Sequence, residues 1–148
     1  MPDELLRKET EEFLHEQIPI SRAMGVRLED CDVGKLALVA PLDVNHNHLG
    51  TAFGGSLGAV ATLAGYTLLW VRMAERNSHI VIRDSRIRYL HPVRQEIRAI
   101  CHEPDGKKFA AFMKCFREKG KARIRLKVTV SEADRTCLEF EGEFVAMA

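Results

Sequence analysis

The feature that most constrains this chain is a run of 28 consecutive residues, 44–71, that contains no Asp, Glu, Lys or Arg. Its second part, residues 57–71, is largely apolar and long enough for several helical turns. A helix that is apolar around most of its circumference must be buried, either in a membrane or in a protein core. The question for the rest of the chain is therefore whether it contains apolar segments that can bury this helix.

A membrane-spanning helix is the first alternative, and the flanking residues argue against it. The uncharged run opens with the polar tetrapeptide 45–48 and contains five glycines, so its apolar part is shorter than the ~20 residues that a span needs. The alternating pattern that follows predicts a strand, which needs an apolar cover. We therefore predict a buried helix from Gly54 to about Asn77, with a polar end over residues 72–77 and no membrane insertion.

Composition is that of one soluble globular domain, which we assign to residues 1–148. The chain has 46% apolar and 29% charged residues and a net charge of only +1, so no overall field favours nucleic acid or a membrane surface. Residues 83–127, however, carry fourteen Lys or Arg against five Asp or Glu. This local excess favours an anionic ligand, whereas nucleic acid is disfavoured because the basic segments lack an aromatic platform or a recognition helix.

Cysteine spacing and the N-terminus predict a cytoplasmic protein with reduced thiols. The four cysteines lie 70, 14 and 22 residues apart, which gives no CxxC pair and no dense disulfide framework. The first eighteen residues carry six acids, whereas a signal peptide would have a basic end and an apolar stretch.

The remaining segments predict an α+β fold in which a curved antiparallel sheet wraps the long central helix. An amphipathic helix is expected over 3–18, ended by Pro19, and a short helix or bulged strand over 109–119. Strands are expected over 26–32, 35–42, 79–90, 94–103, 121–130 and 136–146. Because one such sheet leaves edge strands and one side of the helix exposed, we expect at least a homodimer, or a tetramer.

The last two strands also predict a register. Opposed residues in an antiparallel pair have a constant index sum, and a sum of 266 places Arg123, Arg125 and Lys127 opposite Glu143, Glu141 and Glu139. The alternate residues, including Phe140 and Phe144, then share the buried face, and residues 131–135 form a loop.

A polar loop that runs into a glycine-led helix is the segment best suited to chemistry. A helix N-terminus leaves N–H groups free and carries partial positive charge, and glycines allow close approach of a ligand to the backbone. The amides of Gly54, Gly55 and Ser56 are therefore candidates to hold a developing oxyanion. Asn47 is a candidate to orient water or an acyl carbonyl, and Asn45 is a weaker substrate contact or a loop residue.

This segment resembles the active-site segment of hotdog-fold acyl-CoA thioesterases. Residues 47–55 follow the pattern N-x-x-G-T-x-x-G-G, and residues 87–93 resemble the strand pattern I-x-Y-L-x-P-V of that superfamily. The chain is most similar to the thioesterase-like domain that also occurs fused behind acetyltransferase domains, over about residues 20–147. The resemblance implies a hotdog fold and hydrolysis of an acyl thioester of coenzyme A or acyl carrier protein, with no bound cofactor. It assigns substrate positioning to Asn47 and the oxyanion contact to Gly54.

Two positions depart from the pattern of these thioesterases. Many of them have His where this chain has Phe53, which we count among the substrate-binding candidates, and a carboxylate where this chain has Thr62. Thr62 is either a water-orienting group or a hydroxyl bonded to its own helix. A replacement carboxylate is Asp84, expected to be partly buried beside Arg83 and Arg86, which are candidates for substrate contact or for an ion pair.

Two alternative functions stay open at this stage. The missing helix carboxylate motivates a noncatalytic protein that binds acyl thioesters or lipids. A hotdog dehydratase or hydratase would need an acid–base pair, for which His46 or His48 is the nearby candidate. The same two histidines with Asp43 form the one arrangement that suggests a metal, and we expect no metal site there.

Overall fold

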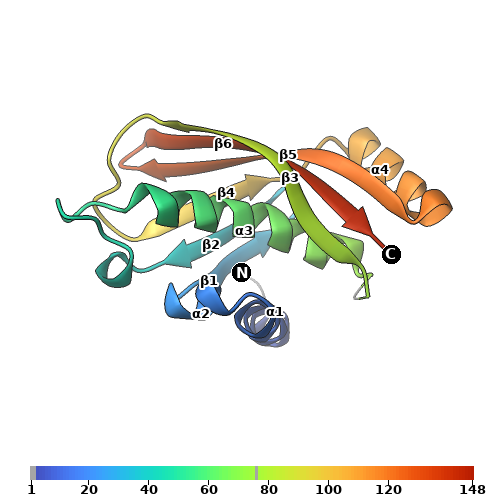
Figure 1. Ribbon diagram of the computed structural model, residues 1–148, viewed down its shortest axis with the longest axis horizontal. Coiled ribbons are helices and arrows are strands. Elements are labelled where there is room, and N and C mark those ends of the chain that lie inside the picture. Colours follow the sequence, from blue (N-terminus) through green and yellow to red (C-terminus); the bar gives the residue numbers. More distant parts are fainter. Residues whose placement is uncertain (1–2, 76) are drawn as a thin grey trace.

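The computed structural model describes residues 3–75 and 77–148, and in it a six-stranded antiparallel sheet curves around one long helix (Figure 1). The helices are α1 (Glu4–Gln17), α2 (Pro19–Ala23), α3 (Gly54–Met73) and α4 (Gly106–Lys119), with a 3-10 turn at Leu42–Val44. The strands are β1 (Arg27–Asp32), β2 (Lys35–Ala40), β3 (His79–Tyr89), β4 (Ile97–His102), β5 (Lys121–Glu132) and β6 (Arg135–Met147). Their order is β1-β2-β4-β5-β6-β3, so β1 and β3 are the edges. The predicted α+β class is confirmed.

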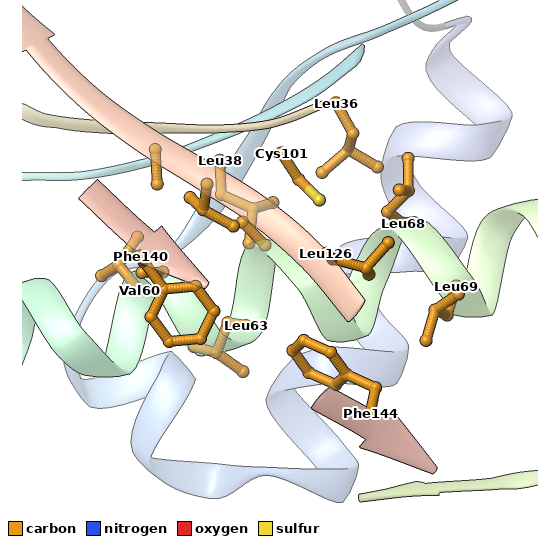
Figure 2. Close-up of a cluster of buried hydrophobic side chains, with 14 of the residues drawn as sticks. Leu36, Leu38, Val60, Leu63, Leu68, Leu69, Cys101, Leu126, Phe140 and Phe144 are labelled. Atoms are coloured by element: carbon orange, nitrogen blue, oxygen red, sulfur yellow. The ribbon is translucent and has the colours of Figure 1, made fainter. Parts of the chain in front are cut away.

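Helix α3 is the buried helix that the uncharged run predicts. Its apolar side chains interleave with those of the sheet, as Figure 2 shows for Leu63 and Leu69 beside Phe140 and Phe144. By length and composition α3 would also qualify as a membrane span, but eleven of its residues are buried by the rest of the chain. It therefore serves as the core of the domain.

The helix ends earlier than the sequence predicts. The last α3 residue is Met73, and Ala74 takes a left-handed conformation with φ of 55°, which stops the helix four residues before the predicted end near Asn77. Arg72 fixes this end, because its guanidinium bonds the Glu103 carboxylate at 2.8 Å and the Asp32 carbonyl at 2.5 Å. The prediction for Arg76 lies outside the described residues.

The N-terminal helices pack on one side of α3. Pro19 ends α1 as predicted and also starts α2, where its missing N–H costs nothing at the first helical position. The Phe13 ring of α1 stacks on Trp70 with ring centres 4.4 Å apart and on Tyr66 at 6.3 Å. These two contacts place α1 beside the second half of α3.

The predicted register of the β5–β6 hairpin is wrong by two residues. Arg125 lies opposite Glu143 rather than Glu141, so the index sum is 268 along most of the pair. The cause is a two-residue turn at Ala133 and Asp134, both with positive φ, which lets the strands continue past the predicted loop. Because a shift of two preserves the alternation, the buried and charged faces are those predicted.

The segment predicted as a short helix or bulged strand is helix α4. The Asp105 side chain caps it by accepting from the Lys107 N–H at 2.8 Å, and Gly120 ends it with φ of 71°. Strand β4 pairs with β5 only at Val128–Val130, and α4 packs along the part of β5 that precedes this pairing. Among the described residues, no strand pairs with this stretch of β5 on that side, and helix α4 covers it there.

Candidate active site

The loop before α3 is held together by Asn47. Its Nδ2 donates to Thr51 Oγ1 at 2.9 Å, and its Oδ1 accepts from the backbone N–H groups of Leu49 at 2.9 Å and Thr51 at 3.2 Å. Its own N–H donates to the Thr51 carbonyl at 2.7 Å. In this structure Asn47 therefore shapes the loop that leads into α3, and a contact with substrate stays a prediction.

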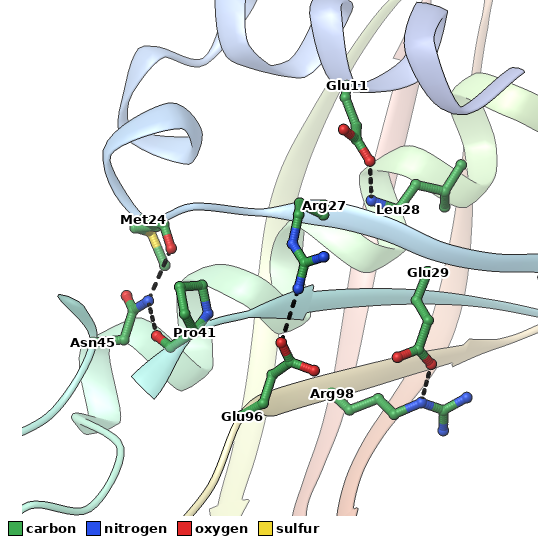
Figure 3. A network of polar contacts seen from close by, with 9 residues as sticks. All are labelled: Glu11, Met24, Arg27, Leu28, Glu29, Pro41, Asn45, Glu96 and Arg98. Atoms are coloured by element: carbon green, nitrogen blue, oxygen red, sulfur yellow. Dashed lines mark hydrogen bonds and ion pairs between the residues drawn. The ribbon is translucent and has the colours of Figure 1, made fainter. Parts of the chain in front are cut away.

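Asn45 anchors the same loop to the N-terminal part of the chain. Its side chain is only 2% exposed, and its Nδ2 donates to the carbonyls of Met24 at 2.9 Å and Pro41 at 2.8 Å (Figure 3). The Asn45 carbonyl accepts from the Phe53 N–H at 2.8 Å. We predicted that Asn45 contacts substrate. In the structure its side chain is buried and bonded to two carbonyls, so it has almost no surface left for a ligand.

The N-terminus of α3 presents free backbone donors. The Leu57 N–H makes the first intrahelical bond, to the Phe53 carbonyl at 3.0 Å, so the preceding N–H groups of Gly54, Gly55 and Ser56 have no acceptor within the helix. No side chain caps this helix end. The half-exposed Phe53 ring lies over Gly55, where an added Cβ would come within 2.4 Å of it. Gly55 is thus required for this packing.

A groove of about 370 Å³ begins at this helix end and follows α3. Its walls come from the first half of α3, from β3 and from the α1–α2 junction. They are formed by Ile18, Ile20, Gly54, Gly55, Gly58, Ala59, Thr62, Leu63, Tyr66, Ile87 and Tyr89. The small residues on α3 leave room for the groove. A Cβ added at Gly58, for example, would lie 3.3 Å from the Ile87 side chain. The lining carries no charged side chain, which suits an uncharged apolar ligand.

Three hydroxyl groups are the polar side-chain atoms of the groove. Thr62 Oγ1 donates to the Gly58 carbonyl at 2.8 Å, one helical turn back, and the Tyr89 hydroxyl donates to the Gly54 carbonyl at 3.2 Å. The third is the phenol of Tyr66, whose pKa burial raises above its ordinary value of 10.0. Among the residues that line the groove, none is a carboxylic acid or an imidazole.

Asp84 does not line the groove. The alternation of β3 shifts at a bulge between Ile82 and Asp84, after which Asp84 lies opposite Glu143 on the sheet face remote from α3. The carboxylate is exposed rather than partly buried as predicted, because β3 is an edge strand. No residue pattern in this strand indicates the bulge.

The two arginines beside Asp84 lie on the edge strand as well. Arg83 forms an ion pair with Glu143 at 2.6 Å, which lowers the pKa of that glutamate below its usual range. Arg86 lies opposite Glu141 on the outer face. Both side chains thus face away from the groove, and neither lines it.

The remaining candidates also lie outside the groove lining. Ser56 is half-buried in the first turn of α3, so it contributes its backbone N–H to the helix end. His46 and His48 are exposed, with His46 Nδ1 2.8 Å from the Asn47 carbonyl. Over residues 3–75 and 77–148 no three His, Cys, Asp or Glu side chains come together as metal ligands.

Sequence reasoning missed the far wall of the groove. Ile18 and Ile20 flank Pro19, and only the turn between α1 and α2 brings them to α3. Tyr66 belongs to the apolar helix and carried no distinguishing pattern. Tyr89 was visible within the strand motif at 87–93, and the structure places its hydroxyl on Gly54.

Comparisons with known proteins extend over nearly the whole chain. The family model described as "Putative thioesterase (yiiD_Cterm)" matches residues 7–148. A solved structure from Chlorobaculum tepidum, described as a protein of unknown function, is 33% identical, with a TM-score of 0.89 and coverage of 96% of this chain and 94% of that chain. One from Shewanella oneidensis, described as a "putative thioesterase", is 28% identical, with a TM-score of 0.87 and coverage of 99% and 100%. The predicted hotdog fold is confirmed by these neighbours.

Proposed function

The chain belongs to this thioesterase family, and from that membership we propose that it hydrolyses an acyl thioester whose acyl group lies in the groove along α3. The observation that carries the proposal is the meeting of an uncharged groove with an uncapped helix N-terminus. An apolar wall binds the acyl chain, and free N–H groups bind the carbonyl oxygen at its end. The carrier of the thioester, coenzyme A or acyl carrier protein, is part of the substrate, and no bound cofactor is needed.

The reaction needs stabilisation of one developing charge. Water adds to the carbonyl carbon of the thioester, and the carbonyl oxygen becomes an oxyanion. The carbon–sulfur bond then breaks to release a carboxylic acid and a thiol. The N–H groups of Gly54, Gly55 and Ser56 supply donors that are already oriented, which is usually the largest contribution to acyl transfer. The partial positive charge of the 20-residue helix α3 acts in the same direction.

The attacking water needs an acceptor for one of its hydrogens. We propose Thr62, because it lines the groove and its hydroxyl hydrogen is directed to the Gly58 carbonyl, which leaves its oxygen lone pairs for water. A hydroxyl orients water without taking its proton, so turnover should be slower than in an enzyme with a carboxylate base. Asp84 is the competing candidate for this role, through a second copy of the chain.

A substitution by proline tests the oxyanion contact directly. Gly54 is the first residue of α3, a position at which proline is well tolerated, and Phe53 before it is already extended with ψ of 134°. Gly54→Pro therefore removes one donor and keeps the helix, whereas Gly54→Ala keeps the donor. In a thiol-release assay with a series of acyl-CoA and acyl-carrier-protein substrates, kcat of the proline variant should fall by roughly 10²–10³ relative to the alanine variant. Equal rates would exclude the Gly54 N–H from the reaction.

A noncatalytic acyl-binding protein is the second candidate. The observation in its favour is that the groove lining contains no carboxylate and no imidazole. It predicts saturable binding of acyl thioesters without thiol release across the same series. A dehydratase or hydratase finds less support, because His46 and His48 are both exposed and neither lines the groove.

A further inference from the structure

Helix α4 lies on the other side of the molecule from α1 (Figure 1). A second concave surface lies where α4 meets β5. Two cavities of about 700 and 400 Å³ share Cys115, Ala122 and Arg123, so they form one continuous trough. We call this the α4 trough. It extends along α4, whose 14 residues span about 21 Å, to the beginning of edge strand β3. This length exceeds what a small ligand would fill.

The α4 trough combines an apolar floor with a basic rim. The floor is formed in part by Val145, Met147, Ala111 and Phe112. The rim carries Lys108, Lys121, Arg123, Arg125 and Arg83. Residues 106–127 as a whole contain nine Lys or Arg and one Glu. An apolar floor beside a basic rim is unusual on a surface that contacts only solvent.

The basic rim is only partly neutralised within the chain. Arg83 and Arg125 form ion pairs with Glu143, at 2.6 and 3.4 Å. Lys108, Lys121 and Arg123 have no carboxylate within 4.0 Å among the described residues. These three exposed cations lie along the trough and give it an unbalanced positive charge.

We propose that the α4 trough is the docking surface for an acidic, amphipathic helix of a carrier protein that delivers the acyl thioester. A helix of that kind complements the trough in length, in charge and in its apolar stripe. Strand β3 borders both surfaces, because it lines the trough at Ile82 and the groove at Ile87, roughly 16 Å further along the strand. This inference rests on the proposed function for its substrate, and it selects the carrier protein over free coenzyme A.

Charge reversal at the trough tests the docking. The probe is a purified bacterial acyl carrier protein, in the apo form for binding and loaded with an octanoyl group for turnover. Lys121→Glu/Arg123→Glu should weaken binding of the apo carrier at least roughly tenfold, and the binding of the wild-type chain should weaken as salt is raised. Lys8→Glu/Arg135→Glu is the matched control, since it makes the same charge change at exposed residues of α1 and of the far hairpin end. It should bind like the wild type.

Turnover of octanoyl-CoA separates this inference from the proposed function. If docking is at the trough, the reversal variant loses carrier-linked turnover and keeps the wild-type rate on octanoyl-CoA. Loss of both rates by the same factor would overturn the proposal, because the cations would then recognise the phosphate that both substrates share. Unchanged carrier binding, or binding of a DNA oligonucleotide in preference to the carrier, would overturn it as well. Carrier binding without hydrolysis of any thioester would refute the proposed function and leave the docking surface intact.

Discussion

At the residue scale, the two candidates for the water-orienting group lie on opposite faces of the sheet. Thr62 lines the groove, whereas Asp84 is exposed on the outer face opposite Glu143. Thr62→Val keeps the shape and removes the hydroxyl, so we expect kcat to fall at least roughly tenfold. Asp84→Asn should change kcat by less than about twofold, because its carboxylate does not reach the groove of its own chain.

The measurement is thiol release by both variants, with urea unfolding as a check that each is folded. The reverse result, a large loss with Asp84→Asn and none with Thr62→Val, would assign the role to the carboxylate. In that case Asp84 would act from a second copy of the chain, since its own sheet separates it from the groove.

The thiol of Cys101 makes a prediction about pH. Burial, with a smaller contribution from Glu103, raises its pKa from an ordinary value of 9.0 to about 12. Folding therefore favours the protonated thiol, and the stability that this contributes is fully present below pH 9 and is lost as the pH rises towards 12. Urea unfolding of the wild type should show a falling free energy of unfolding from pH 8 to 10.5.

Cys101→Val is the matched comparison, since it keeps an apolar side chain at a fully buried position and removes the titrating group. Its free energy of unfolding should fall less over the same pH range. An identical slope in both proteins would show that another group controls alkaline stability.

At the element scale, the contact between α3 and β6 depends on Gly65. A Cβ there would lie 2.5 Å from Cζ of Phe144, whose fully buried ring has no room to move. Gly65→Ala should therefore lower the free energy of unfolding by about 1–3 kcal/mol, although alanine is the better helix former. Gly58→Ala is the control, because its Cβ meets the flexible end of Ile87 at 3.3 Å and the Tyr89 hydroxyl at an ordinary contact distance of 3.8 Å.

Urea unfolding at neutral pH checks this pair. Gly58→Ala should be neutral or slightly stabilising, and it should slow turnover because it narrows the groove. The double variant Gly65→Ala/Phe144→Leu should recover part of the loss, since the smaller side chain makes room. Equal stability of the two alanine variants would contradict a close approach at Gly65.

The elements themselves were largely predictable, and their junctions were not. An uncharged helix and alternating strands give strong periodic signals, so α3 and the faces of β5 and β6 follow from the sequence. The hairpin register did not, because the turn at Ala133 and Asp134 uses positive φ without glycine or asparagine. The exposure of Asp84 depends on a bulge that leaves no trace in the alternation.

The residues of the candidate site also fall into a group that the sequence predicts and a group that it does not. Gly54 and Gly55 were predictable because a helix start has a local signature and a known chemistry. The wall at Ile18 and Ile20 was not, because it arises when the distant turn between α1 and α2 packs against α3. The role of Asn47 as a substrate contact stays a prediction, and its hydrogen bonds within the loop give it a structural role that needs no substrate.

At the scale of the whole molecule, a single chain leaves the outer edge of β3 exposed along its whole length. β3 is an edge strand of eleven residues, and Val81, Ile82 and Tyr89 on it are 47%, 37% and 57% exposed. A long exposed edge strand invites pairing with another chain. The same edge borders the groove through Ile87, so a second copy would also close the open side of the candidate site.

We therefore predict that two copies pair through β3, and that this pairing is needed for activity. Light scattering of the wild type should give a mass of about twice 16.7 kDa, or four times if dimers pair. Ile82→Lys/Leu90→Lys places one charge within β3 and one directly after its last residue, and it should give a single-chain mass and little thiol release. Leu5→Lys, at a position 66% exposed on α1, adds the same type of charge away from the edge and should change neither quantity. A wild type with the mass of one chain and full activity would contradict the pairing, and the groove of a single chain would then have to suffice.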